Sequence, residues 1–65
     1  MRAAIVVNPI AGRGKGTSIA LEACAEFNRL GWKTELMLTK YAGEAVELTR
    51  QAVAQAFDIV LACGG

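Results

Sequence analysis

The sequence contains no histidine, one proline and two cysteines, and this composition argues against several kinds of metal and catalytic site. Without histidine, the chain lacks the usual imidazole ligand of zinc and the usual base of a Cys/His nucleophilic pair. Cys24 and Cys63 stand among apolar residues and lack the CxxC spacing of metal or redox motifs. Since no export signal precedes them, we expect both to be reduced core thiols of a cytoplasmic protein.

Long hydrophobic runs and an excess of one charge are also missing. The longest uncharged run, residues 3–12, contains Asn8-Pro9 and falls short of the roughly 18 apolar residues of a membrane span. The apolar stretch after Arg2 is too short for a signal peptide. Seven Lys or Arg residues oppose six Asp or Glu residues, and the net charge of +1 therefore indicates neither a nucleic acid nor an anionic membrane as a partner.

The composition is that of a folded chain. Apolar residues make up 54% of the sequence and charged residues 20%, which excludes a disordered segment. With 65 residues the chain forms one small domain at most, and a chain of this size buries only about 60% of its extended surface. Because the sequence stops on Gly64-Gly65 directly after an apolar run, we expect residues 1–65 to be the N-terminal part of a larger domain.

Hydrophobic patterns predict three strands and two helices. The continuous apolar runs at 3–7 and 59–63 are typical of central, fully buried strands. Alternation over 33–39 predicts a strand nearer the sheet edge. Apolar residues at three- and four-residue spacing predict helices over about 18–30 and 44–56.

The helix ends and inner faces can also be predicted. Thr17 or Ser18 is suited to cap the first helix, and Gly31 to end it in a left-handed conformation. Trp32 and Tyr41 are isolated aromatic residues, for which partial core packing is a better interpretation than base stacking. The inner faces are expected to consist of Ala20, Ala23, Cys24, Phe27 and Leu30 in the first helix, and of Ala45, Leu48, Ala52, Val53 and Ala56 in the second.

The resulting order, β-α-β-α-β, predicts an α/β fold with an open parallel sheet and right-handed crossovers. Three strands and two helices amount to half of a doubly wound domain, because a sheet buried on both faces needs more cover than two helices supply. This pattern favours truncation independently of the terminal glycines.

Three loops lie at the carboxyl ends of the predicted strands, where parallel sheets bind their ligands: residues 8–16, 39–43 and 64–65. The first loop contains glycines, two cations and the start of a helix, a combination that favours a phosphate over a plain turn. Its Gly12-Arg13-Gly14-Lys15-Gly16 spacing matches neither the dinucleotide fingerprint nor the P-loop. For Thr39 and Gly64-Gly65, a turn without ligand is the competing interpretation.

Three segments of the chain resemble the catalytic domain of diacylglycerol kinases. Val6 to Gly16 resembles the N-terminal motif of that family, which includes bacterial lipid kinases, sphingosine kinases and ceramide kinases. Leu38-Thr39 followed by Gly43-Glu44-Ala45 is similar to the second signature, with Glu44 in place of the usual histidine. Residues 58–65 look like the strand that enters the Gly-Gly-Asp-Gly-Thr motif, cut after its second glycine. The family is more distantly similar to NAD kinases and 6-phosphofructokinases, whose nucleotide-binding fold the resemblance implies.

The resemblance implies ATP-dependent phosphorylation of a lipid hydroxyl, with Mg²⁺ beside the nucleotide. It implies no catalytic and no metal-binding residue in these 65 residues, because the acidic general base and the lipid-binding second domain belong to later parts of the family's chain. We therefore expect the 65 residues alone to be inactive, and the whole protein to be cytoplasmic with transient contact to a membrane surface. The positions that match the family's nucleotide site are Asn8, Pro9, Ile10, Ala11, Gly12, Thr39, Gly64 and Gly65.

Two other functions stay open at this point. An NAD kinase-like nucleotide kinase shares the terminal glycine motif and differs mainly in the stretch from Asn8-Pro9 to Gly16. A non-catalytic phosphate-binding α/β module would use the same loops without transfer chemistry. A dehydrogenase is disfavoured because Leu36 to Leu38 ends the second strand, where a carboxylate would hold the ribose. Diacylglycerol, a sphingoid base and phosphatidylglycerol are all compatible acceptors for a lipid kinase.

Overall fold

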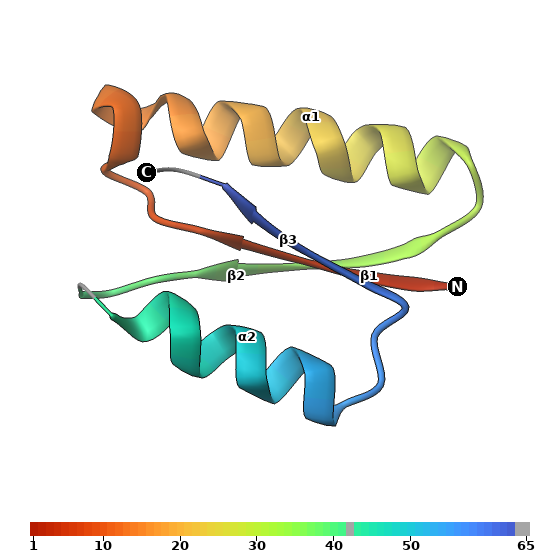
Figure 1. Ribbon diagram of the computed structural model, residues 1–65. Helices are drawn as coiled ribbons and strands as arrows, with labels where there is room; N and C mark the ends of the chain where they lie inside the picture. The colour runs from red at the N-terminus through yellow and green to blue at the C-terminus, as the bar shows by residue number, and fades with distance from the viewer. Residues whose placement is uncertain (42, 64–65) are drawn as a thin grey trace.

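The computed structural model describes residues 1–41 and 43–63 and places one helix on each face of a small parallel sheet (Figure 1). The fold therefore agrees with the predicted β-α-β-α-β order. Helix α1 covers one face of the sheet and helix α2 the opposite face, as Figure 1 shows. The elements are β1 (Arg2–Val7), a short 3₁₀ helix η1 (Ala11–Gly14), α1 (Lys15–Arg29), β2 (Lys33–Leu38), α2 (Glu44–Ala54) and β3 (Ile59–Cys63).

The sheet has the order β2-β1-β3, and both strand pairs are parallel. In the register, Ile5 of β1 lies opposite Leu36 of β2 and Leu61 of β3. Ala3, Ala4, Ile5 and Val7 are completely buried, which confirms the central strand predicted from the first apolar run.

Both outer strands, β2 and β3, lie at edges of the sheet, whereas the sequence predicted an edge position only for the first of them. Strand β2 lies at an edge, as its mixed pattern indicated. The expectation that residues 59–63 form a central strand is wrong for this sheet: β3 lies at the other edge, and most of its side chains are only half-buried. Its apolar run is typical of burial on both faces, but burial also depends on neighbours, and β3 pairs only with β1 among the described residues.

The core lies between β1 and α1. Ile5, Val7 and Ala20 are fully buried, and partly buried apolar residues of α1 and the outer strands pack against them. Cys24 and Cys63 are among these: both are half-buried and pack against the core, as their apolar contexts predicted.

The predicted inner faces of the helices are partly wrong. Leu30, Val53 and Ala56 are exposed, whereas Ala20 and Ala52 are buried as expected. Periodicity identifies the side of a helix that faces the sheet, but it does not show where the helix extends past the residues that could cover it. Leu30 and Ala56 lie just beyond the ends of their helices, and Val53 lies in the last turn of α2.

Helix α1 ends in a Schellman motif, as Gly31 predicted. The Gly31 N–H donates to the Asn28 carbonyl oxygen at 3.0 Å and the Trp32 N–H to that of Phe27 at 2.9 Å. Gly31 has a φ of +89°, which glycine adopts without the steric cost of a Cβ. The rings of Phe27 and Trp32 meet edge-on with centroids 5.1 Å apart, the apolar contact that accompanies this motif. The predicted partial core packing of Trp32 is thus confirmed.

Helix α2 ends in the same pattern but with alanine at the left-handed position. The Ala56 N–H donates to the Val53 carbonyl oxygen at 3.0 Å and the Phe57 N–H to that of Ala52 at 3.3 Å. Ala56 has a φ of +60°, where the Cβ crowds the backbone. The second helix end therefore stores strain that the first avoids.

Replacing Ala56 by glycine should stabilise the protein. The left-handed conformation costs a residue with a Cβ about 1–2 kcal/mol, and glycine removes this strain from the folded state. Glycine also gives the unfolded chain more conformational entropy, which cancels part of the gain in stability. We expect Ala56→Gly to raise the free energy of unfolding by roughly 0.5–1 kcal/mol, measured by urea denaturation. Ala25→Gly, at an exposed position inside α1, is the matched control and should lower it by about 1 kcal/mol. If the free energy of unfolding fell equally in both variants, Ala56 would not be strained.

Candidate functional site

The carboxyl ends of all three strands meet at Val7 and Asn8. The Thr39 N–H, directly after β2, donates to the Val7 carbonyl oxygen at 2.9 Å. On the other side of β1, the Asn8 N–H donates to the Cys63 carbonyl oxygen at 3.3 Å. Asn8 therefore stands between the loop that follows β2 and the end of β3, at the edge where parallel sheets bind ligands.

A cavity of about 190 Å³ opens at this edge between the first two loops. Its walls come from the residues that follow β1 and β2. The lining residues are Asn8, Pro9, Ile10, Thr39, Lys40 and Tyr41.

The cavity joins four of the residues that the sequence singled out. Asn8, Pro9, Ile10 and Thr39 line it together, and Thr39 is only 7% exposed. Ala11 and Gly12 continue the first loop as the start of η1. Gly64 and Gly65 lie outside the described residues, although Cys63, which precedes them, is hydrogen-bonded to Asn8. The predicted meeting of the first two loops is therefore confirmed.

Asn8 shapes the first loop through its side chain. Its Oδ1 accepts a hydrogen bond from the Ile10 N–H at 3.1 Å, which forms an Asx turn around Pro9. Pro9 has no N–H of its own and restricts the backbone at Asn8. The asparagine–proline pair thus turns the chain sharply out of the buried strand and sets Ile10 at the cavity.

The first helix begins earlier than predicted. We expected a helix from about Ser18 with Thr17 or Ser18 as its cap, whereas α1 begins at Lys15 after η1. Its N-cap is Gly14, with φ of +89° and no side-chain hydrogen bond to the helix. Gly14 reaches this left-handed conformation without a Cβ clash, and the backbone can therefore turn directly into the helix. The N–H groups of the first turn are left without a cap from Gly14, as in helix ends that bind anions.

The second loop is held by Glu44, the residue that departs from the second family signature. Glu44 Oε1 accepts a hydrogen bond from the Lys40 N–H at 2.6 Å. In return, the Glu44 N–H donates to the Tyr41 carbonyl oxygen at 3.3 Å. This reciprocal pair fixes the backbone of Lys40 and Tyr41 against the start of α2, where a carboxylate is also favoured by the helix dipole.

The charge around the cavity suits a phosphate better than a metal ion. Lys40 lines the cavity. Arg13 in η1 and Lys15 at the start of α1 are exposed and do not line it. The Glu44 carboxylate is already engaged by the Lys40 N–H. Within residues 1–41 and 43–63, no group of three or more His, Cys, Asp or Glu is placed to hold a metal ion. A Mg²⁺ ion, which prefers carboxylates and phosphate oxygens, thus has no protein cage among these residues.

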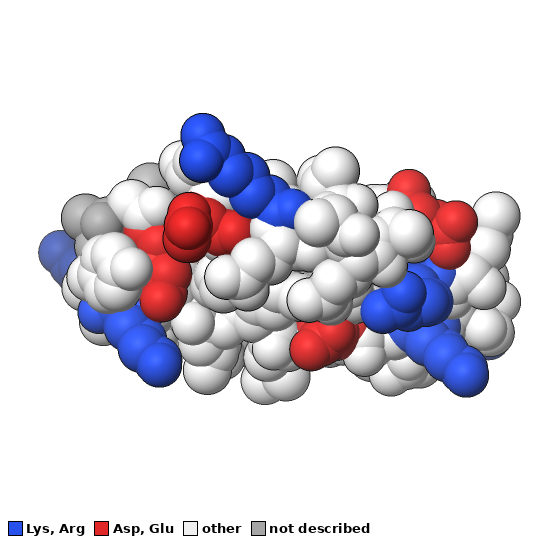
Figure 2. Space-filling model, turned by 90° about the horizontal axis from the view of Figure 1, so that it is seen from below, with Lys and Arg blue, Asp and Glu red and all other residues white. Residues whose placement is uncertain are grey.

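Charges elsewhere on the molecule are mixed. On the face that includes α2, cationic and acidic side chains alternate over a mostly uncharged surface (Figure 2). This distribution agrees with the near balance of charge in the sequence.

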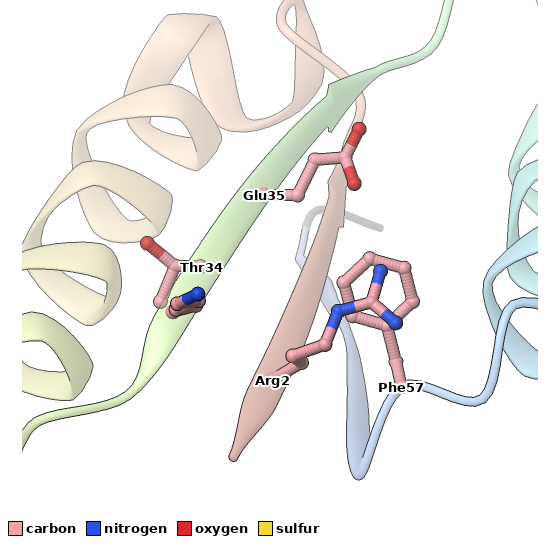
Figure 3. Close-up of a pocket in the computed structure, with 5 residues that line it drawn as sticks. Arg2, Thr34, Glu35 and Phe57 are labelled. Atoms are coloured by element: carbon pink, nitrogen blue, oxygen red, sulfur yellow. The ribbon is translucent and has the colours of Figure 1, made fainter.

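A second cavity, of about 230 Å³, lies at the opposite, amino edge of the sheet (Figure 3). The Arg2 guanidinium lies 4.1 Å from the centroid of the Phe57 ring, and its Nη1 donates to the Gln55 carbonyl oxygen at 2.9 Å. The Arg2 backbone also exchanges hydrogen bonds of 2.7 and 2.8 Å with Asp58. These contacts join the start of β1 to the end of α2, and they give Arg2 a structural role. The lining residues are Arg2, Lys33, Thr34, Glu35 and Phe57.

Two residues that line the cavity at the carboxyl edge, Lys40 and Tyr41, are not among the predicted site residues. Lys40 was assigned to a turn, and Tyr41 was expected to pack partly in the core, yet Tyr41 is 63% exposed and lines the cavity. The expectation for Tyr41 is therefore wrong. Tyr41 follows Thr39 by two residues, and this position in the loop could have identified it as a site residue. Hydrophobicity alone does not distinguish an exposed aromatic residue from a packed one.

The family described as the diacylglycerol kinase catalytic domain matches residues 2–65. A diacylglycerol kinase of Bacillus subtilis (strain 168) is 31% identical over 64 residues, which cover 98% of this chain and 21% of that protein. The chain thus spans about a fifth of the length of the curated relative it matches. No solved structure matched the chain. None of the described helices is both long and apolar enough to span a bilayer.

Removing the Glu44 carboxylate should loosen the second loop. Glu44→Ala deletes the acceptor of the Lys40 N–H, whereas Glu44→Gln retains a side-chain oxygen at the same place. We expect Glu44→Ala to lower stability by about 1 kcal/mol and to speed amide exchange at Lys40 about fivefold, as measured by NMR hydrogen exchange. Glu44→Gln should stay close to the parent rate. Equal exchange rates at Lys40 in all three proteins would show that the carboxylate does not hold the loop.

Proposed function

Because this chain belongs to the diacylglycerol kinase catalytic domain family, we propose that it forms part of the nucleotide site of an ATP-dependent lipid kinase. The observation that carries the proposal is the cavity at the carboxyl edge of the sheet, where Asn8, Pro9 and Ile10 face Thr39. These residues match the motif positions that surround the nucleotide in the family.

The chemistry of phosphoryl transfer fits what this edge provides. Transfer depends on positioning the phosphates and neutralising their charge, and little covalent chemistry is required of the protein. Uncapped N–H groups at the start of α1, together with Arg13, Lys15 and Lys40, supply positive potential at this edge. The Asx turn at Asn8 holds the first loop in a fixed shape against which a nucleotide can bind.

When bound with the nucleotide, Mg²⁺ would supply neutralisation of the phosphate charge. The described residues hold the nucleotide in this proposal and leave the metal to the phosphates. In this proposal Ala11 and Gly12, which follow Ile10 in the chain, and Gly64 and Gly65, which follow Cys63, complete the nucleotide contacts.

The acceptor in this proposal is the hydroxyl group of a lipid, which brings the whole protein transiently to a membrane surface. The matched relative carries the name diacylglycerol kinase, and this chain corresponds to about a fifth of it. We therefore place the lipid site and the general base outside residues 1–65. Phosphorylation of NAD instead of a lipid would favour the NAD kinase-like alternative.

Asn8 variants test whether phosphates lie at the first loop. In the protein that contains this chain, Asn8→Ala removes the Asx turn and should weaken ATP binding about tenfold. Asn8→Asp keeps the oxygen acceptor but adds a negative charge, so it should weaken ATP about as much and should weaken adenosine, which has no phosphate, clearly less. Isothermal titration calorimetry measures both affinities. Parental ATP affinity in Asn8→Asp would exclude phosphates from this loop.

A further experiment tests whether residues 1–65 contain the groups needed for catalysis. We expect residues 1–65 alone to show no ATP-to-ADP turnover with Mg²⁺ and diacylglycerol vesicles, because the general base lies elsewhere in the proposal. Circular dichroism of the same sample, showing helix and strand, would establish that the fragment is folded. Lipid-dependent turnover by the folded fragment would overturn the proposed placement of the catalytic base.

A further inference from the structure

Two exposed apolar side chains line the cavity at the carboxyl edge. Ile10 is 81% exposed and Tyr41 is 63% exposed, and they come from different loops. Exposing large apolar side chains forgoes the free energy of their burial, which is roughly 25 cal/mol for each Å². Other exposed apolar residues, such as Leu30 and Val53, line neither of the two cavities described above. Ile10 and Tyr41 thus combine exposure with a place in a concave site.

Building on the proposed function, we propose that Tyr41 and Ile10 form the walls that hold the purine base of ATP. A flat aromatic ring stacks on any base through its π-face, and an aliphatic side chain covers the base through apolar contact. Tyr41 is then a base-binding residue that neither the sequence motifs nor the family comparison assigned.

The size and composition of the cavity favour a base. Its volume of about 190 Å³ is below the roughly 300–1,000 Å³ of pockets that hold drug-sized molecules, so it suits one part of a nucleotide. Pro9, Ile10 and Tyr41 contribute apolar surface, while Asn8 and Thr39 contribute polar groups. An apolar slot with a few polar groups is the usual environment for a heteroaromatic ring.

The loop that carries Tyr41 is preorganised. The Tyr41 carbonyl oxygen accepts a hydrogen bond from the Glu44 N–H, and the Lys40 N–H donates to the Glu44 carboxylate. Thr39 is nearly buried and tied to Val7, so the backbone on both sides of Lys40 is held in place. A ring on a fixed loop loses less conformational entropy on binding than one on a free loop.

The position of the phosphates follows from the same geometry. With the base between Ile10 and Tyr41, the triphosphate extends along the first loop toward the start of α1, where Gly14 leaves the N–H groups uncapped. One end of the site is then apolar and recognises the base, and the other is cationic and recognises the phosphates.

Tyr41 variants test the stacking in the whole protein. We expect Tyr41→Ala to raise the Kd for ATP, ADP and adenosine about tenfold, measured by calorimetry, since all three share the base. Inorganic triphosphate, which has no base, should inhibit the kinase activity of Tyr41→Ala as strongly as it inhibits that of the parent protein. Tyr41→Phe keeps the ring and should bind all three ligands as the parent does. Val53→Ala, at a comparably exposed residue that does not line the cavity, is the control for surface truncation.

The outcomes separate this inference from the proposed function. If the parent protein binds no ATP, the proposed function fails, whatever Tyr41 does. If the parent binds ATP and Tyr41→Ala binds it equally well, the stacking proposal is overturned. Unchanged ATP affinity with weaker binding of Tyr41→Ala to anionic lipid vesicles would also overturn it and assign Ile10 and Tyr41 to membrane contact.

Discussion

The burial of β1 on both faces, with parallel hydrogen bonds along both edges, determines where everything else in this chain lies. Its residues from Ala3 to Val7 are essentially without solvent contact, because α1 covers one face and α2 the other. A strand in this position must satisfy all of its backbone groups through its neighbours. The requirement brings β2 and β3 to its two sides, and their carboxyl ends therefore arrive at the same edge.

The functional edge is a direct result of that arrangement. The Val7 carbonyl oxygen accepts a hydrogen bond from the Thr39 N–H, and the Asn8 N–H donates one to the Cys63 carbonyl oxygen. Residues from three distant parts of the sequence are therefore fixed within one small region. The loops then diverge from a rigid base, which is how parallel α/β folds combine a fixed scaffold with adaptable binding residues. The Asx turn at Asn8 and the Glu44 contacts extend this rigidity into the loops.

Much of the fold could be predicted from local patterns, and the errors have physical causes. The apolar run at the first strand and the glycine at position 31 report on local geometry, and both predictions hold. The start of α1 was misplaced because Gly14 and η1 replace the expected side-chain cap. Tyr41 was misassigned because an aromatic ring in a short loop can pack inward or remain exposed, and only its neighbours decide between the two.

Periodicity and motif spacing are properties of the chain. They are sufficient to predict the order of the elements, the buried central strand and the three segments that resemble the lipid kinase motifs. The shared cavity of Asn8, Thr39 and Tyr41, and the position of β3 beside β1 at an edge of the sheet formed by the described residues, follow from the tertiary structure alone. Residues about 30 positions apart become neighbours through strand pairing and helix packing. Those interactions join the whole chain, so no local pattern contains them.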